Sequence, residues 1–304
     1  MLRRVVLTMG LWGALAMGLA QNTPGPRGLP ENATQRVSEH VYAITGFPNI
    51  GIIVGSRATM VVDTGMGVRN GAVVVREVEK LAKAPNLYLT TTHFHPEHAT
   101  GEQAFPPRTV IVRPAVQQEE MDQRGDEFVE MFRNRSSLNK ELLEGVRLRR
   151  PDIVFDREIM INLGGVTAQL LWWGGGHTKG DELIFVVEDA VLLSGDIVQN
   201  KLVPGMPNAD SSVKGWLALL DRIETLEPKY IIPDHGGFGD ASLIHQQRAF
   251  MRNVQRRGEE LKREGVPVEE AGKRLEEELK TNYADWPNLS AIANVVRRVY
   301  AEAP

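Results

Sequence analysis

The chain has 304 residues, of which 42% are hydrophobic and 24% are charged, and its formal net charge is −4. This composition is typical of a globular protein with one large domain or two small ones, and the negative charge argues against nucleic-acid binding. The chain contains no cysteine. Disulfides, a thiolate nucleophile and thiolate metal ligands are therefore excluded.

Residues 1–20 have the pattern of a secretory signal peptide. Arg3 and Arg4 precede an apolar run over residues 5–19, and small residues surround a predicted cleavage point after Ala20. The alternative is a retained membrane anchor, which needs about twenty apolar residues, and this run is shorter. Cleavage would leave 33 basic and 39 acidic side chains, a net charge of −6. We therefore predict a periplasmic or secreted protein without membrane attachment.

Residues 21–35 are rich in proline and glycine, a composition that predicts a flexible tether. The folded part is expected to begin at Arg36. Short β-branched runs separated by Gly46-Phe47-Pro48-Asn49 and by Gly55-Ser56-Arg57 predict successive hairpin strands. These strands are expected at residues 37–44, 50–54 and 59–62.

A strand, a helix and another strand come next. The third predicted strand ends in Asp63-Thr64-Gly65, a helical spacing of apolar residues covers 70–84, and residues 87–90 form an apolar strand. This alternation is typical of an α/β layout. In that layout, side chains from several loops meet at the carboxyl ends of the strands.

A cluster of histidines follows this strand directly. His93, His95 and His98 lie within six positions, together with Glu97, and the whole chain has only seven histidines. Imidazole and carboxylate groups are ligands that suit zinc, iron or manganese. A single histidine is more often a core or surface residue, but three at this density indicate a metal site. His93 and His95 can converge on one ion, and Glu97 and His98 then suggest a second.

Residues 115–150 form a polar, mostly helical segment after a predicted short helix at 99–105 and a strand at 109–112. Two interpretations of this insertion stay open. It is either a lid that supplies substrate contacts or a surface helical pair that packs on the sheet. Strands are expected to resume at 159–163 and 166–173.

Three further strand ends present candidate ligands. The turn Gly174-Gly175-Gly176 leads into His177, and glycines there permit positive φ and close backbone approach. Asp196 and His235 each follow another apolar strand. Each of these residues alone is weak evidence, because such residues occur in ordinary turns. Their repeated placement after strands predicts a single shared site.

The ordered series of motifs resembles the metallo-β-lactamase superfamily from about residue 36 to 245. The resemblance implies an α/β (α+β) fold, a four-layer αββα sandwich, with a two-metal site along one edge of its sheets. The catalytic domain would cover residues 36–264. The five motifs are Asp63-Thr64-Gly65, His93-x-His95-x-Glu97-His98, Gly176-His177-Thr178, Ser194-Gly195-Asp196 and Asp234-His235-Gly236.

The resemblance also implies a role for each motif residue. Two zinc ions per chain are expected, with a single ion or iron as alternatives. Asp63 would orient the site through hydrogen bonds to the ligands. The first ion would be bound by His93, His95 and His177, the second by His98 and His235, and both by a bridging Asp196.

Two positions depart from the patterns of the family. Aspartate is usual where Glu97 stands, and the extra methylene moves the carboxylate by roughly 1.5 Å, far outside the ~0.2 Å tolerance of a metal–ligand distance. Glu97 therefore ligates the second ion, acts through a water, or weakens that site. Several antibiotic-hydrolysing members have cysteine where this chain has Asp196. An aspartate there is similar to the thioesterase, lactonase and phosphodiesterase branches.

The expected chemistry follows from zinc. A zinc ion lowers the pKa of bound water toward ~7, and a second ion can share the hydroxide and hold the leaving group. Glu97 or Asp196 would act as the catalytic acid and base. We therefore predict that a metal-bound hydroxide attacks a carboxylic ester, thioester, lactone or lactam bond of a small-molecule substrate.

Three alternative functions stay open. A β-lactamase proper is compatible with export, but Asp196 and Glu97 argue against it. A mononuclear iron oxidoreductase, similar to a persulfide dioxygenase, would use similar ligands. A non-catalytic metal-binding accessory protein would keep the ligands without turnover. The sequence does not indicate an oligomeric state.

Helices are expected at residues 242–264, 268–281 and 289–301, and residues 265–304 would form a C-terminal helical extension.

The pocket walls are expected from loops 45–49 and 66–70 and from the 115–150 insertion. Five side chains are candidate substrate contacts, although ordinary surface lysines and buried tryptophans are an equally good interpretation. They are Trp172, Trp173, Lys179, Asn200 and Lys201.

Overall fold

The computed structural model describes residues 28–304. The predicted signal peptide and the tether up to residue 27 lie outside the described residues. Within residues 28–304, none of the helices combines the length and the apolar composition that a membrane crossing requires.

A seven-stranded mixed sheet forms the first half of the fold, in the order β1-β2-β3-β4-β5-β6-β7. Strands β1 to β4 pair antiparallel, and β4 to β7 pair in parallel. On β4, Met60 and Val62 face the second sheet, whereas Val61 faces helix α1 (Gly67–Leu81). The centre of this sheet is covered on both faces, which is why β3 and β4 are buried along their whole length. The strands are β1 (Thr34–Arg36), β2 (Val41–Ile44), β3 (Ile50–Val54), β4 (Ala58–Val62), β5 (Asn86–Thr90), β6 (Val110–Pro114) and β7 (Ile153–Phe155).

A five-stranded sheet in the order β12-β11-β10-β9-β8 packs against the first. Its β11 and β12 pair in parallel and its other neighbours pair antiparallel. The two sheets pack closely at Gly51, where an added Cβ would lie 1.9 Å from Cδ2 of Leu193. A larger side chain at residue 51 would therefore require the side chain of Leu193 to move. The strands are β8 (Glu158–Asn162), β9 (Thr167–Leu171), β10 (Leu183–Val186), β11 (Val191–Leu193) and β12 (Tyr230–Ile232).

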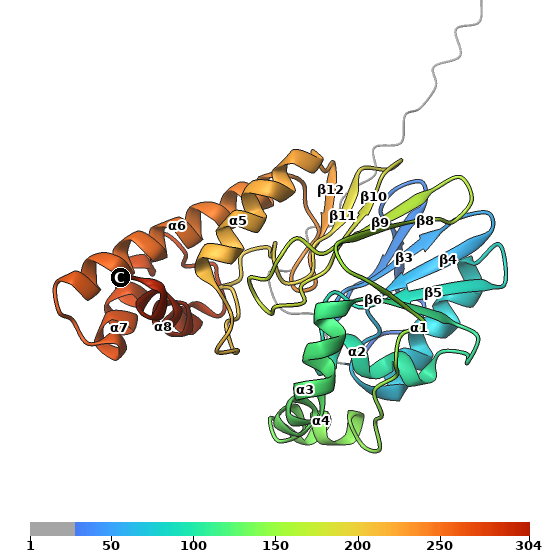
Figure 1. Cartoon of the computed structure of the whole chain (residues 1–304), viewed down its shortest axis with the longest axis horizontal. Helices are drawn as coiled ribbons and strands as arrows, with labels where there is room; N and C mark the ends of the chain where they lie inside the picture. Colours follow the sequence, from blue (N-terminus) through green and yellow to red (C-terminus); the bar gives the residue numbers. More distant parts are fainter. Residues whose placement is uncertain (1–27) are drawn as a thin grey trace, which may run out of the picture.

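Helices cover the outer face of each sheet (Figure 1). Helix α1 packs Val73, Val74 and Val78 on the first sheet. Helices α5 (Val213–Ile223) and α6 (Ser242–Arg263) pack on the second. The layer order of helix, sheet, sheet and helix confirms the predicted αββα sandwich. The other helices are α2 (Pro96–Ala99), η1 (Thr100–Ala104), α3 (Ala115–Arg133), α4 (Ser137–Leu142), η2 (Glu224–Leu226), α7 (Val268–Leu279), η3 (Leu289–Ala291) and α8 (Ile292–Glu302).

Two helical units project from the sandwich (Figure 1). Helices α3 and α4 form the predicted insertion, and Met121 and Phe128 of α3 pack against Phe94 in the histidine loop. Helices α7 and α8 form the C-terminal extension, and Leu275 and Val295 share one apolar core with α5 and α6. The insertion therefore packs beside the histidine loop, and the extension packs on the outer helical layer.

The fold departs from the sequence-based expectations in three places. The tether predicted for residues 21–35 is wrong at its end, because β1 begins at Thr34 and the buried Leu29 donates its N–H to Asn70 Oδ1 at 3.0 Å. The three-residue β7 and helix α5 were not predicted. Helix α5 has a recognisable start, since the Ser212 hydroxyl accepts a hydrogen bond from the N–H of Gly215.

Candidate metal centre

Five loops bring the predicted ligands to one edge of the two sheets. Each loop begins at the end of a strand: Asp63 follows β4, the histidine cluster follows β5, and the other three ligand loops follow β9, β11 and β12. In the first sheet β4 pairs in parallel with β5, and in the second β11 pairs in parallel with β12. The carboxyl ends of each pair therefore lie at the same edge of their sheet. The seven predicted ligands are all buried, and they are His93, His95, Glu97, His98, His177, Asp196 and His235.

The histidine motif is bent by a single helical turn. Pro96 occupies the start of α2, where its fixed φ favours a helix and its missing N–H is not needed. Glu97 and His98 lie on this turn, while His93 and His95 lie in the bend before it. The ring centroids of His93 and His98 are 3.9 Å apart, so the two halves of the motif stay side by side.

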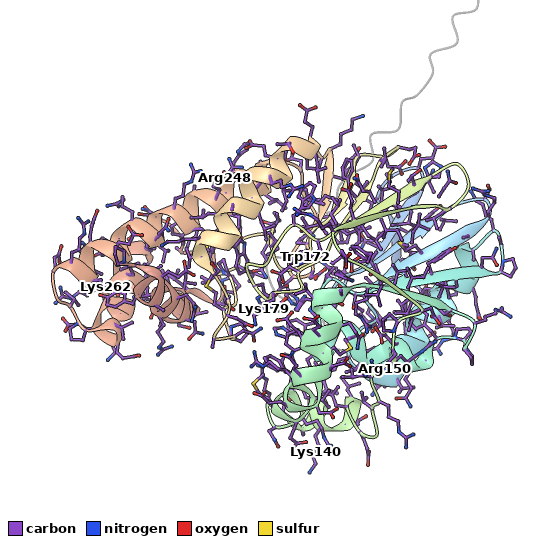
Figure 2. All side chains as sticks on the ribbon, viewed as in Figure 1. Lys140, Arg150, Trp172, Lys179, Arg248 and Lys262 are labelled. Carbon is purple, nitrogen blue, oxygen red and sulfur yellow. The ribbon has the colours of Figure 1, made fainter. Side chains whose placement is uncertain are left out.

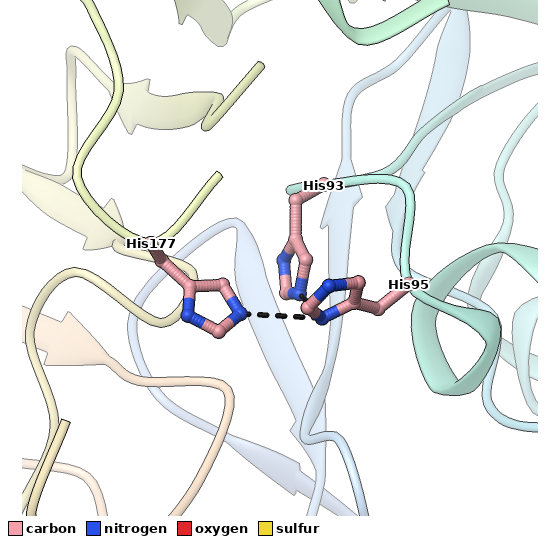
Figure 3. A group of neighbouring side chains, drawn as sticks. All are labelled: His93, His95 and His177. Atoms are coloured by element: carbon pink, nitrogen blue, oxygen red, sulfur yellow. Dashed lines mark hydrogen bonds between the residues drawn. The ribbon is translucent and has the colours of Figure 1, made fainter. Parts of the chain in front are cut away.

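The first ligand group consists of His93, His95 and His177 (Figure 3). Nδ1 of His95 lies 3.0 Å from Nε2 of His93 and 3.2 Å from Nε2 of His177. Three nitrogens around one tetrahedral zinc ion would lie about 3.3 Å apart, because zinc–nitrogen bonds are about 2.0 Å long. The spacing of these imidazoles therefore fits one metal ion.

The second ligand group consists of Glu97, His98 and His235. Asp196 lies between the groups, since its Oδ2 is 3.3 Å from Nε2 of His177 and its Oδ1 is 3.3 Å from Nε2 of His235. The position assigned to Asp196 by resemblance, between two ions, is therefore compatible with where its oxygens lie.

Unpaired polar atoms support this assignment. Oε2 of Glu97 and Nε2 of His98 are buried and have no hydrogen-bond partner among the described residues. A buried polar atom without a partner costs about 1–3 kcal/mol, and a bound cation would satisfy both atoms. The donor set of imidazoles and carboxylates fits zinc, iron or manganese.

Three of the histidines are held neutral. Burial, together with neighbouring imidazoles, lowers the pKa of His93 and His95 well below that of an ordinary histidine. Burial also lowers the pKa of His235 to about 4, although the charge of Asp196 opposes this effect. Neutral imidazoles are the form that binds metal.

His98 has the opposite behaviour. Burial acts to lower its pKa, but the carboxylates of Asp63, Asp234 and Glu97 outweigh burial and raise the pKa to about 10. The carboxylates therefore favour a positive charge at this point of the site, which either a proton or a metal ion supplies. The pKa of Asp196 is lowered because nearby imidazoles outweigh its burial, so this residue stays anionic.

Asp63 and Asp234 organise the histidine loop. Asp63 Oδ1 accepts the N–H of Thr92 at 2.8 Å, and its Oδ2 lies 3.1 Å from Nδ1 of His98. Asp234 Oδ2 accepts the Thr92 hydroxyl at 2.6 Å and lies 3.3 Å from the same nitrogen. No role was predicted for Asp234, although it immediately precedes His235. Its position at a strand end, beside a candidate ligand, was the available signal.

A third carboxylate shapes the loop of His177. Asp181 accepts the backbone N–H groups of Gly176, His177 and Thr178 at 2.8 to 3.1 Å. The preceding turn uses glycine as predicted, because Gly174 has a φ of +110°. An added Cβ at Gly176 would lie 2.8 Å from Cα of Trp216. Hydrogen bonds to Asp181 and the close approach to Trp216 therefore hold the loop of His177.

A pocket of about 250 Å³ opens over both ligand groups. The predicted loop 45–49 contributes Phe47, and the 115–150 insertion contributes Phe132 and Arg135. The predicted loop 66–70 does not line the pocket. Two contributors were missed, the segment between β11 and α5 and the C-terminal extension. They supply Gln199, Leu202, Val203, Gly205, Met206, Pro207, Asn288 and Asn294.

The five candidate substrate contacts lie outside this lining. Figure 2 labels Lys179 and Trp172, and the indole N–H of Trp172 donates to the backbone carbonyl of Lys179 at 2.8 Å. Lys201 forms an ion pair with Asp285. Their positions agree with the ordinary surface interpretation.

Comparisons with known proteins give a consistent set of relatives. Metallo-beta-lactamase type 2 of Bacteroides fragilis is 23% identical over 126 residues, which are 40% of this chain and only 50% of that enzyme. Human acyl-coenzyme A thioesterase MBLAC2 is 26% identical over 221 residues, 66% of this chain and 73% of the thioesterase. The sec-alkylsulfatase Pisa1 from Pseudomonas sp. has a similar fold, with a TM-score of 0.69 and 16% identity, covering 88% of this chain and 49% of the sulfatase.

The family assignment rests on a longer match. The model of the metallo-beta-lactamase superfamily matches residues 43–235, which contain all the predicted ligands and both sheets except β1 and part of β2. The fold and the buried ligand groups described above agree with this match. This chain therefore belongs to the metallo-beta-lactamase superfamily, a superfamily of metal-dependent hydrolases.

Proposed function

We propose that the chain is an exported zinc-dependent hydrolase that cleaves a carboxylic ester, thioester, lactone or lactam bond of a small-molecule substrate. The observation that carries this proposal is Asp196, whose two oxygens lie 3.3 Å from His177 of one ligand group and from His235 of the other. A carboxylate between two ligand groups suits the two-metal arrangement of hydrolytic enzymes.

The residues of the site have separate tasks. Zinc ions bound there would supply a water-derived nucleophile at neutral pH and polarise the scissile carbonyl. Glu97 has a pKa raised by burial, and it lies with His98 and His235 in the second group. It would accept the proton of the attacking water and return it to the leaving group. Asp196, with its lowered pKa, would keep its negative charge and hold the two ligand groups together.

The relatives support acyl-group chemistry. One is named a β-lactamase and another an acyl-coenzyme A thioesterase, and both reactions attack a carbonyl carbon. Cleavage of β-lactams stays an alternative within this class. The pocket contains apolar side chains beside the ligands, including Phe47, Leu202 and Met206, which would contact the carbon part of an acyl substrate.

Arg135 indicates the charge of the substrate. Apart from the candidate ligands, it is the only formally charged side chain that lines the pocket within residues 28–304. Its guanidinium carbon lies 3.7 Å from the ring centroid of Phe132, and that ring lies 6.1 Å from the ring of His95. A guanidinium pairs well with a planar carboxylate through two parallel hydrogen bonds. We therefore propose that the preferred substrates are anionic.

The experiment that tests the function is elemental analysis of the mature protein, purified without chelator or added metal, followed by assays on esters, thioesters, lactones and lactams. About two zinc ions per chain with turnover would support the proposal. One iron ion per chain would instead favour the oxidoreductase. Bound zinc without turnover on any class would favour an accessory metal-binding protein.

Export has its own test. Expression of the full chain in a bacterium with a periplasm, followed by intact-mass measurement, would give the mass of a protein beginning at Gln21. The uncleaved mass in the cytoplasmic fraction would contradict export without affecting the proposed chemistry.

A further inference from the structure

The C-terminal helical extension lies outside residues 43–235, the segment that matches the family. We propose that this extension completes the metal centre, with Asn288 acting as a positioning residue for His177. The inference rests on the proposed function in one respect, because it requires His177 to bind a metal ion. It assigns to the extension a task beyond packing on the outer helical layer.

His177 takes its orientation from the segment between β11 and α5. Its Nδ1–H donates to the backbone carbonyl of Gly205 at 2.7 Å, which leaves Nε2 facing His95 and Asp196. The hydroxyl of Ser211 donates to the backbone carbonyl of His177 at 2.7 Å. A hydrogen bond at one ring nitrogen of a histidine ligand fixes both the tautomer and the ring plane that the metal meets.

The segment that holds His177 lacks regular secondary structure. Residues 197–212 form no helix or strand, so its backbone groups need partners from elsewhere. Asn288 supplies two of them: its Oδ1 accepts the N–H of Val203 at 2.9 Å, and its Nδ2 donates to the carbonyl of Val203 at 3.0 Å. The side chain thus pairs with both polar groups of one residue, two positions before Gly205.

The extension makes further contacts with the same segment. Arg298 Nε donates to the carbonyl of Ser211 at 2.8 Å, and Glu302 accepts the N–H groups of Val213 and Lys214 at 2.8 and 3.0 Å. Together with Asn288, these bonds hold both ends of the stretch from Val203 to Lys214. The carbonyl of Gly205 lies inside this stretch.

Asn288 itself has firm support. It follows Trp286, which is buried and whose ring stacks on Phe250 of α6 at 4.7 Å between centroids. Tyr283 packs edge-on against both rings. Asn288 and Asn294 also line the pocket. The extension therefore reaches the site from an aromatic cluster on α6. Asn288 contacts Val203, which lies two residues before the Gly205 carbonyl that holds His177.

The test compares cobalt-substituted proteins. The visible absorption of Co²⁺ depends on ligand geometry, so Asn288→Ala is expected to change the shape or intensity of the spectrum. Its affinity for zinc, measured by competition with a chromophoric chelator, is expected to fall about tenfold. Glu270→Gln is the matched control, because it removes an exposed ion pair with Arg274 that lies wholly within the extension. The control is expected to keep the spectrum and the zinc affinity of the wild type.

A milder variant covers the risk that Asn288→Ala does not fold. Asn288→Asp keeps an acceptor for the N–H of Val203 and loses the donor to its carbonyl, so an intermediate spectrum and affinity are expected. A lower melting temperature with unchanged spectrum and zinc affinity, in either variant, would overturn the inference and leave a purely structural role. A wild-type chain that binds neither zinc nor cobalt would overturn the proposed function and the inference together.

Discussion

Asp63 Oδ2 lies 3.1 Å from Nδ1 of His98, and both side chains are completely buried. Asp63 also accepts the backbone N–H of Thr92, and it adopts a φ of +65°, which is uncommon outside glycine. One aspartate thus fixes both ends of the motif from Thr92 to His98. It resembles the carboxylates that commonly orient histidine ligands from behind.

Asp63→Asn is expected to weaken the second ligand group. Asparagine tolerates the left-handed conformation and can still accept from Thr92, so the fold should survive. It cannot supply the negative charge that favours a cation at His98, and zinc affinity should fall about 10- to 100-fold. Chelator competition measures this change. Asp189→Asn, which breaks the pair with His40 at 2.8 Å away from the site, is the control. Equal affinities in the two variants would contradict the orienting role.

Glu97→Gln tests whether the unusual glutamate is a ligand. The buried Oε2 of Glu97 has no hydrogen-bond partner among the described residues, and the glutamine amide is a poorer metal donor than a carboxylate. Elemental analysis should show about one zinc ion in place of two, and kcat should fall about 100-fold through loss of the base. A variant that keeps two zinc ions would show that Glu97 acts on the proton alone.

Arg135→Gln tests the preference for anionic substrates. For two esters that differ only in a terminal carboxylate, the wild type should have the higher kcat/KM for the anionic one. In the variant, the ratio of the two kcat/KM values should fall about tenfold. Arg133→Gln at the end of α3, two residues earlier, removes an ion pair with Glu130 outside the pocket and should keep the preference. Equal wild-type rates on both esters would reject the anion preference while leaving the hydrolase activity in place.

Glu120→Gln should change how stability depends on pH. Burial raises the pKa of Glu120 from 4.5 to about 7, although its carboxylate accepts the N–H groups of Lys179 and Gly180. Because the folded-state pKa is the higher one, its contribution to stability is complete below pH 4.5 and is lost as the pH rises through 7. The loss for this group should be about 3 kcal/mol.

Urea unfolding of both proteins at several pH values, with a zinc chelator present, measures this contribution. The stability of the wild type relative to Glu120→Gln should decrease between pH 4.5 and 8. A difference that does not vary with pH would contradict the raised pKa of Glu120.

Much of the fold and the ligand set was determined by the sequence itself. Short β-branched and apolar runs placed most strands, and the polar residues directly after them, from Asp63 to His235, marked one edge of the sheets. That inference works because strand ends and ligand types are local properties. The sequence also showed that Glu97 stands where the family usually has aspartate, because this departure needs only one residue to be compared with the family motif.

The walls of the pocket and the support of the ligands were decided only by the tertiary structure. Asp234 meets His98 across 136 residues of sequence, and Asn288 meets Val203 across 85. The first contact depends on how the two sheets pack and the second on how the C-terminal extension packs, and hydrogen bonds between distant loops leave no periodic signal in the chain. The sequence therefore determined which groups are candidate metal ligands, whereas packing determined which side chains hold them and which residues line the pocket beside them.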